Sequence, residues 1–149
     1  MFLSFFRKNT NQGLDDIRHL VEISQYAEAL TATSKFLDFN RKNYEGHILR
    51  GRILQLMNKT TEAIEFYESI ILEFPENIEA YINLIGIYSE PCIISGTLVR
   101  GYENEIAWNK IIALGNQVGI MNKDKVPFQE MAVAYHALGR TQLALDAYD

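Results

Sequence analysis

The stretch TEAIEFYESIILEFPEN, residues 61–77, places a small residue, Ala63, four residues before Tyr67 and twelve before Pro75. The run before the proline is amphipathic with the spacing of an α-helix. Pro75 ends this helix, because proline has no backbone N–H and disfavours helical geometry at the residue before it. Asn77 is suited to cap a following helix. The stretch therefore predicts a helix, a turn and a second helix.

The same offsets recur along the chain with a period of about 34 residues, a length typical of helical repeat proteins. Ala29 lies one period before Ala63, and Ala144 lies two periods plus 13 extra positions after it. The segments YINLIGIY at 81–88 and FQEMAVAY at 128–135 each hold an aromatic residue, an apolar residue three positions later and Tyr seven positions later. Units of this kind bury a continuous core between neighbours.

On these residues the chain resembles the tetratricopeptide-repeat (TPR) family. Residues 44–77 match its repeat unit at Gly51, Leu54, Ala63, Tyr67, Ile70 and Pro75. Residues 125–149 match it at Phe128, Met131, Ala132, Tyr135, Ala144 and Tyr148. The resemblance implies an all-α fold, an α-α superhelix or solenoid of helical hairpins, with the first helix of each hairpin on the concave side.

The repeat frame predicts a single domain over residues 1–149, with repeats at 10–43, 44–77, 78–124 and a truncated fourth at 125–149. Small residues such as Gly51 and Ala63 let the two helices of a hairpin approach closely. The expected helices lie at 14–23, 26–38, 44–57, 60–73, 78–89, 103–117, 127–138 and 141–149.

Two irregularities interrupt this frame. The 13 extra residues fall in the third repeat and are expected in SEPCIISGTLVRGYEN at 89–104. This insertion is either a tolerated loop or, given its apolar residues, a loop that folds onto a surface. The chain also stops at Asp149, short of a full repeat. Either it is a fragment of a longer protein, or it forms a homo-oligomer through its open C-terminal end.

Composition narrows the class of partner and the compartment. The chain has 14 Lys and Arg against 19 Asp and Glu, a net charge of −5, so nucleic acid is not expected as a partner. No apolar run is long enough for a membrane span. Cys92 is the only cysteine, so no disulfide can form within the chain, which favours a cytoplasmic protein.

No group of residues has the spacing of a catalytic, metal or cofactor site. His19, His47 and His136 are scattered and lack metal-ligand spacing to Cys92 or to a carboxylate. His47 takes an aromatic packing position, so a core or boundary histidine is expected. The sequence therefore predicts neither an enzyme nor a cofactor.

The resemblance implies that one face of each first helix lines a peptide-binding groove. The side chains placed there are Arg18, Ile48, Arg52, Gln55, Asn83, Gln129 and His136. Arg18 and Arg52 hold the same position in adjacent repeats and could bind carboxylates or stack on aromatic rings. Alternatively, they pair with Glu22, Glu45 or Glu79 and only solubilise the groove. The carboxylate clamp of the family's chaperone-binding members is absent, since Asn83 alone matches it.

The sequence therefore predicts a non-catalytic protein–protein interaction module that binds a partner peptide or helix in its concave groove. One alternative is a recognition arm of a larger enzyme, such as a glycosyltransferase. Another is a self-assembling structural scaffold.

Overall fold

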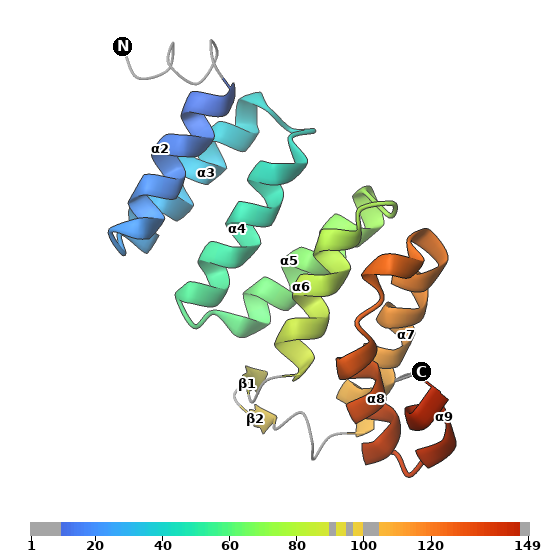
Figure 1. Cartoon of the computed structure of the whole chain (residues 1–149). Helices are drawn as coiled ribbons and strands as arrows, with labels where there is room; N and C mark the ends of the chain where they lie inside the picture. The colour runs from blue at the N-terminus through green and yellow to red at the C-terminus, as the bar shows by residue number, and fades with distance from the viewer. Residues whose placement is uncertain (1–9, 90–91, 95–96, 100–104, 147–149) are drawn as a thin grey trace, which may run out of the picture. The chain divides into compact units, whose positions relative to one another are not determined.

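The computed structural model describes residues 10–89, 92–94, 97–99 and 105–146. In this part of the chain the helices are α2 (Thr10–Glu22), α3 (Tyr26–Phe39), α4 (Tyr44–Leu56), α5 (Thr60–Glu73), α6 (Ile78–Ser89), α7 (Glu105–Met121), α8 (Phe128–Ala137) and α9 (Thr141–Asp146) (Figure 1). A short 3-10 helix, η2, spans Lys123–Lys125, and two strands, β1 (Cys92–Ile94) and β2 (Thr97–Val99), lie between α6 and α7. All eight helices expected from the sequence are present, so the all-α prediction is confirmed. The largest differences are at the start of α2 and the end of α7, each of which extends one helical turn beyond the expected bound.

Contacts between residues divide the chain into two compact units, Met1–Ala63 and Ile64–Asp149. The first unit contains α2, α3 and α4 with the first residues of α5, and the second contains the remaining elements.

The core of the first unit forms where α2, α3 and α4 pack together. Its buried residues are Leu14, Ile17, Ala29, Phe36, Leu37 and Ile53. Gly46 allows α4 to lie close to α3, because a Cβ atom there would come within 3.0 Å of both Leu37 and Phe36. Thr33 is fully buried, and its hydroxyl donates to the carbonyl of Ala29 at 2.6 Å, which satisfies this polar group inside the core.

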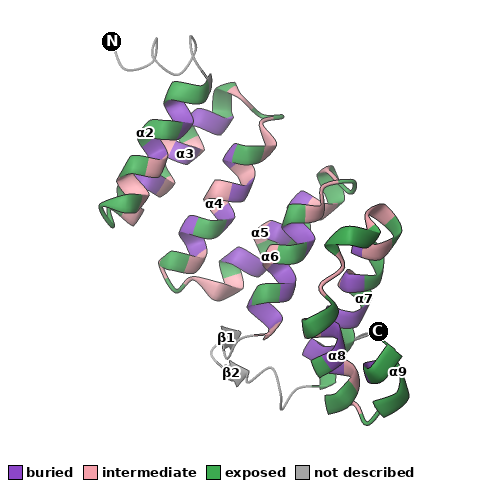
Figure 2. Ribbon diagram, viewed as in Figure 1, coloured by how far each residue is buried: buried purple, intermediate pink, exposed green. Residues whose placement is uncertain are grey.

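The second unit has its core around α6, α7 and α8. Helix α6 is largely purple in Figure 2, with Ala80, Tyr81, Leu84, Ile85, Ile87 and Tyr88 buried. Helices α7 and α8 meet at Gly115, where a Cβ atom would lie only 2.4 Å from the sulfur of Met131. In α9 only Ala144 is buried among the described residues, and the helix is otherwise green in Figure 2.

The turns that close α2, α4 and α8 share one backbone geometry. Ser24, Asn58 and Gly139 have φ angles of 61°, 57° and 71°. Ser24 precedes Asn58 by one repeat period, and Gly139 follows it by two periods plus the extra residues. After each, the next N–H bonds five residues back to the end of the preceding helix at 2.8–2.9 Å, the pattern of a Schellman motif. The repeat period is therefore visible in the backbone as well as in the side chains.

The residues that cap the starts of helices α4 and α6 also recur with the repeat period. Helix α5 ends at Glu73, two residues before Pro75, as the sequence predicts. The side-chain oxygen of Asn77 then accepts from the N–H of Glu79 at 3.3 Å. Asn43, one period earlier, accepts from the N–H of Gly46 at 2.8 Å. Both asparagines cap the following helix.

The third turn is different. Its equivalent of Asn58 is Cys92, which lies in the antiparallel hairpin of β1 and β2, with Cys92 opposite Val99 and Ile94 opposite Thr97. The sequence did not predict these strands. The side chains of residues 90–104, including the apolar cluster expected to fold onto a surface, lie outside the described residues.

The extra residues are divided between two connections. The first buried residues of α7 follow the pattern of those in α5. Ala107 lies one period plus ten positions after Ala63, and the same offset relates Trp108 to Ile64 and Ile111 to Tyr67. Ten of the 13 extra residues therefore precede this point, and three follow it, in the longer α7 and the connection that contains η2. The expected insertion near 89–104 lies mostly outside the described residues, so the bounds of the third repeat stay a prediction.

Candidate functional site

Arg18 on α2 is already engaged inside the first unit. Its guanidinium donates to Asp15 at 2.6 Å on the same helix and to the carboxylate of Glu45 on α4. Glu45 is one of the partners considered from the sequence. These charges are partly exposed, so water and salt weaken their attraction. Arg18 therefore ties α2 to α4, and a ligand would have to displace Glu45 to use it.

The other predicted groove residues of the first unit differ from one another in exposure. Arg52 is exposed, and it makes no hydrogen bond or ion pair with any residue in the described ranges. Gln55 is half-buried. Ile48 is only 8% exposed, so it offers little surface to a ligand. Of these three, Arg52 is the most exposed.

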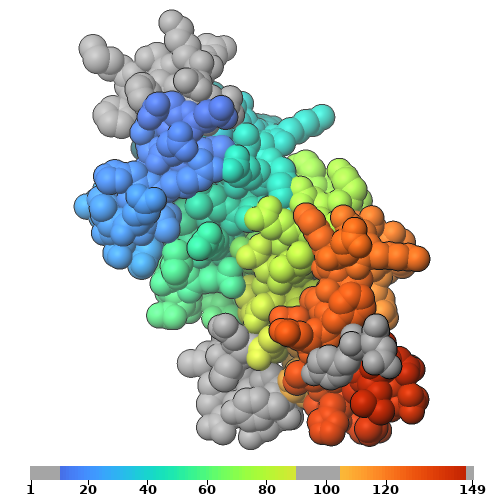
Figure 3. Space-filling model, in the orientation of Figure 1, coloured from blue at the N-terminus to red at the C-terminus, as the bar shows by residue number. Residues whose placement is uncertain are grey.

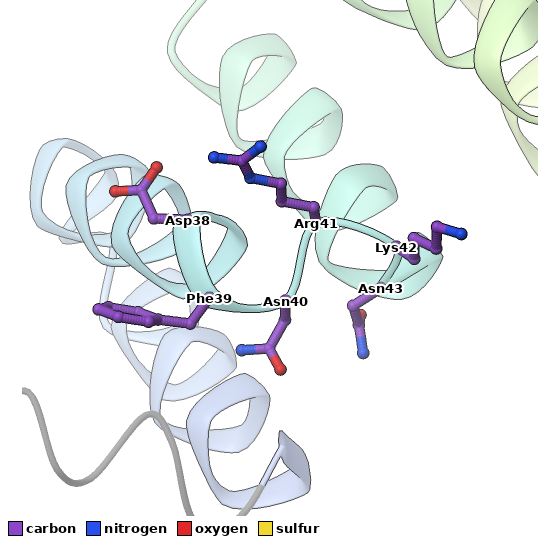
Figure 4. Close-up of a pocket in the computed structure, with 6 residues that line it drawn as sticks. All are labelled: Asp38, Phe39, Asn40, Arg41, Lys42 and Asn43. Carbon is purple, nitrogen blue, oxygen red and sulfur yellow. The ribbon is translucent and has the colours of Figure 1, made fainter.

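The first unit also has a shallow hollow of about 610 Å³ at the connection between α3 and α4. It is lined by Asp38, Phe39, Asn40, Arg41, Lys42 and Asn43 (Figure 4). Ring nitrogen Nε2 of His47 lies 2.7 Å from the carbonyl of Arg41 and fixes this connection, which fits the expected boundary role of His47. Figure 4 shows the side chains pointing to different sides of the chain. The hollow is the inside of one turn and has no set of groups that converge on a ligand.

In the second unit, the two predicted residues of α8, Gln129 and His136, share an exposed face with Val133. The three lie four and three positions apart, and all are exposed. Asn83 on α6 is half-buried, and its side-chain amide donates to the carbonyl of Glu79 at 2.7 Å. The amide oxygen of Asn83 is left to accept from a ligand.

A cleft of about 210 Å³ lies at one end of this face. It is lined by Ser89 at the end of α6, by Trp108 of α7, and by Gln129, Glu130 and Val133 of α8. Figures 1 and 3 show α6 (yellow-green) and α8 (orange) side by side on one surface of the second unit. The cleft is therefore built by three helices, and the extra residues between α6 and α7 begin directly after Ser89.

The chemistry of the cleft is apolar at Trp108 and Val133 and rich in hydrogen-bond acceptors elsewhere. Trp108 is only 5% exposed, and Val133 is about half exposed. Ser89 donates its hydroxyl hydrogen to the carbonyl of Ile85 at 2.9 Å, which leaves its oxygen as an acceptor. Glu130 is half-buried and forms no hydrogen bond or ion pair within the described part of the chain.

The second unit also contains a lysine held between a carboxylate and a phenol. The Lys110 ammonium donates to the hydroxyl of Tyr88 at 2.7 Å and to Glu68 at 3.1 Å, and it lies 4.9 Å from the centre of the Tyr88 ring. Burial is the main cause that raises the pKa of Tyr88. The hydrogen bond with Tyr88 is the main cause that raises the pKa of Lys110. This cluster joins α5, α6 and α7, and Lys110 is not available to a ligand.

The two units differ in charge. Residues 64–149 hold 12 acidic and 5 basic residues, a formal charge of −7, whereas residues 1–63 hold 7 acidic and 9 basic residues, a charge of +2. Neither α6 nor α8 contains a Lys or Arg. The cleft therefore lies in the acidic unit, and of the three helices that build it only α7 carries a lysine or arginine, Lys110.

Other kinds of site find no support in the described ranges. No group of three or more His, Cys, Asp or Glu side chains there could hold a metal ion. None of the helices in this part of the chain has both the length and the apolar character that a bilayer crossing requires.

The structure brings some predicted residues together and adds new ones. It places Gln129 in the cleft with Ser89 and Val133, and it puts His136 on the same helix face. Arg18 and Arg52 belong to the other unit. Sequence reasoning missed Trp108 and Glu130. Trp108 could have been found only by placing α7 in register after the insertion.

No protein-family model matches the chain, and no curated protein sequence matches it. Among solved structures, the chain is similar to TTC0263, a thermophilic TPR protein of Thermus thermophilus, with a TM-score of 0.68 and 16% identity over 93% of this chain and 71% of that one. It is also similar to MamA, residue 41 to the end, from Desulfovibrio magneticus RS-1, with a TM-score of 0.66 and 14% identity over 98% and 79% of the two chains. These likenesses show the fold, which is that of the tetratricopeptide repeats, as the sequence predicts.

Proposed function

From its tetratricopeptide-repeat fold, we propose that this chain is a non-catalytic protein-interaction module whose second unit binds a peptide segment of a partner across α6 and α8. The observation that carries the proposal is the cleft between Ser89, Trp108, Gln129, Glu130 and Val133. Its 210 Å³ is below the roughly 300–1,000 Å³ of pockets for small molecules. A space of this size suits one side chain of a peptide.

The exposed face of α8 extends the binding surface beyond the cleft. Gln129, Val133 and His136 together present an amide, an apolar group and an imidazole along the helix. The partner segment anchors one side chain in the cleft and lies along this face. The contacts along the face contribute little to the binding free energy, but they exclude water around the anchor.

Asn83 belongs to the same proposal as a secondary contact. Its amide oxygen can accept a hydrogen bond from a partner's backbone or side chains. Replacing Asn83 by Ala weakens binding of the same peptide. The matched control is Asn109→Ala, which removes an exposed amide of α7 that also donates to its own helix and lies outside the cleft lining. Arg52 lies in the first unit, and its role in binding stays a separate prediction. The single cysteine and the absence of long apolar runs fit a role in the cytoplasm.

Selection from a display library of short random peptides, with the full chain as bait, tests the proposal. Trp108 is the only tryptophan, so its fluorescence reports directly on the cleft. We expect selected peptides to change this fluorescence and to bind the double variant Gln129→Ala/Val133→Ala about tenfold more weakly or worse.

The matched control is Asn116→Ala/Gln117→Ala, which changes two exposed residues of α7 outside the cleft. This variant should bind with unchanged affinity and show the same fluorescence change. If no peptide is enriched, or if both double variants bind as the wild type does, the proposed function is wrong.

A second candidate function, self-assembly, is supported by the apolar surface of α9. Leu143 and Leu145 are 47% and 56% exposed on this helix. If they form a contact between copies, the mass measured by light scattering rises with concentration, and Leu143→Ser/Leu145→Ser abolishes the rise. A constant monomer mass in the wild type removes this candidate.

A further inference from the structure

We propose that the cleft is an anchor site for a cationic side chain, a lysine or arginine, in a basic segment of the partner protein. This inference rests on the proposed function and adds the chemistry of the ligand. It follows from the acceptors of the cleft, its indole ring and the charge around it.

Three of the residues that line the cleft carry acceptor oxygens, and one of them is a carboxylate. The oxygen of Ser89, the amide oxygen of Gln129 and the carboxylate of Glu130 can all accept hydrogen bonds. Glu130 is half-buried and has no basic partner in the described ranges. A carboxylate that becomes fully covered when a peptide binds needs a counter-charge, because an unpaired buried charge is costly. An ammonium or guanidinium group supplies this charge.

Trp108 adds a second attraction for the same ligand. Tryptophan is the best aromatic partner for a cation, which is drawn to the negative face of the ring. The second unit already holds a lysine in such surroundings, since Lys110 lies 4.9 Å from the centre of the Tyr88 ring and donates to Glu68. Trp108 with Glu130 offers an incoming cation the same pair of groups, an aromatic ring and a carboxylate.

On the three helices that build the cleft, no lysine or arginine competes with an incoming cation. α6 and α8 contain no Lys or Arg, and Lys110, the single basic residue of α7, is held by Tyr88 and Glu68. The formal charge of −7 on residues 64–149 also attracts a basic segment from a distance and speeds its association. Charge complementarity thus selects one class of partner.

Other anchors fit less well. A carboxylate anchor, such as a peptide C-terminus, would meet Glu130 and find no lysine or arginine among the residues that line the cleft. A purely apolar anchor would pack on Trp108 and Val133. It would also displace the water around the Glu130 carboxylate and offer no hydrogen-bond donor in return, which is costly. Only a cation satisfies the ring and the carboxylate together.

The test uses the peptides enriched by the full chain. We expect an arginine or lysine in each. Synthetic copies in which arginine is replaced by citrulline, or lysine by 6-hydroxynorleucine, nearly keep the shape and lose the charge. These neutral copies should bind about tenfold more weakly than the parent peptides, since a charge-assisted hydrogen bond is lost.

The protein side of the test is Glu130→Gln, which is nearly isosteric and removes one negative charge. It should weaken the parent peptides about tenfold and leave the affinity of their neutral copies unchanged. Glu73→Gln, an exposed glutamate at the end of α5 outside the cleft lining, removes the same charge and is the matched control. Equal thermal unfolding of both variants shows that the fold is intact.

The outcomes separate this inference from the proposed function. Enriched peptides that are neutral or acidic, and that still depend on Gln129 and Val133, overturn the cationic anchor and leave the peptide-binding function standing. Equal weakening by Glu130→Gln and Glu73→Gln also overturns the anchor, because it shows an effect of overall charge alone. If no peptide is enriched, both the function and the anchor are wrong.

Discussion

Single residues that adopt a left-handed backbone define the turns of this fold. Gly139 holds its φ of 71° without strain, whereas Ser24 adopts 61° with a side chain. We expect Gly139→Ala to lower the free energy of unfolding by about 1 kcal/mol, because a side chain is disfavoured in this region. Ser24→Gly should raise it by up to about the same amount. Urea denaturation measures both changes.

The control for this pair is Gly86→Ala. Gly86 lies inside helix α6 with nothing within 4 Å of the position of a Cβ, so alanine there should stabilise the helix by about 1 kcal/mol. If Gly86→Ala raises the free energy of unfolding and Gly139→Ala lowers it, the effect at Gly139 comes from the turn geometry and not from the added methyl group alone. If both substitutions stabilise, the turn assigned to Gly139 is wrong.

Gly115 tests close packing between α7 and α8. A Cβ at this position would lie 2.4 Å from the sulfur and 2.7 Å from Cγ of Met131. We expect Gly115→Ala to destabilise the protein by about 1–3 kcal/mol, because Met131 must move within a packed core. In a Met131→Ala background the same Gly115→Ala change should cost less than in the wild type, because the colliding side chain is gone. Unchanged thermal unfolding of Gly115→Ala would contradict the packing.

For single residues, the sequence predicted the buried packing positions better than the exposed binding positions. Ala63, Ala132 and Ala144 are buried as the repeat pattern requires, since small buried residues follow directly from helix spacing. The candidate site was harder, because exposure depends on neighbours that the pattern does not contain. Ile48 is nearly buried, and Arg18 is paired with Glu45. Neither fact can be read from the repeat positions alone.

At the scale of elements, the cluster of Lys110, Tyr88 and Glu68 holds α5, α6 and α7 together. The pKa values of Tyr88 and Lys110 are both raised above their ordinary 10.0 and 10.5. A raised pKa means that the folded state favours the protonated group. This stabilisation is therefore complete below about pH 10 and is lost as the pH rises through the raised values.

We expect the free energy of unfolding of the wild type to fall steeply above pH 10. Tyr88→Phe should make this fall shallower, because it removes the buried phenol and the main cause of the raised pKa of Lys110. The control is Tyr26→Phe on α3, which should keep the slope of the wild type. Chemical denaturation along a pH series measures the slopes, and identical slopes for the two variants would contradict the prediction.

Helices were predictable, and the hairpin was missed, for different physical reasons. Eight amphipathic segments carry the helical period over ten or more residues each, apart from the short described part of α9, so their number and order follow from the sequence. The segment CIISGTLV has two triplets rich in strand-forming residues, Cys-Ile-Ile and Thr-Leu-Val, around a Ser-Gly pair, which is a hairpin signal that the helical pattern obscured. The insertion interrupts the repeat count before α7, so the buried positions of this helix could not be assigned from the sequence alone.

At the scale of the whole molecule, each of the two units has its own core. Ile17 in the first and Ile111 in the second are fully buried. Replacing either by Ala should cost about 2–5 kcal/mol. Because repeats are stabilised by their neighbours, the loss should act mainly within the mutated unit.

Hydrogen exchange of the full chain measures this division. Ile17→Ala should lower the protection of amides in α2, α3 and α4 more than that of amides in α6, α7 and α8. Ile111→Ala, as the matched partner, should give the reverse pattern. Equal loss of protection throughout the chain by either variant would show that the whole molecule unfolds as one cooperative body.

The hairpin that stands in place of the third Schellman turn shows where new residues can be inserted into this chain. Ten residues enter between α6 and the buried start of α7, yet Ala107 still occupies the place that Ala63 holds in α5. The helical scaffold thus tolerates grafting at this junction without losing its repeat register. The short turns at Ser24, Asn58 and Gly139 are the corresponding graft points, and an engineer could use them to add new recognition loops while leaving the helices intact.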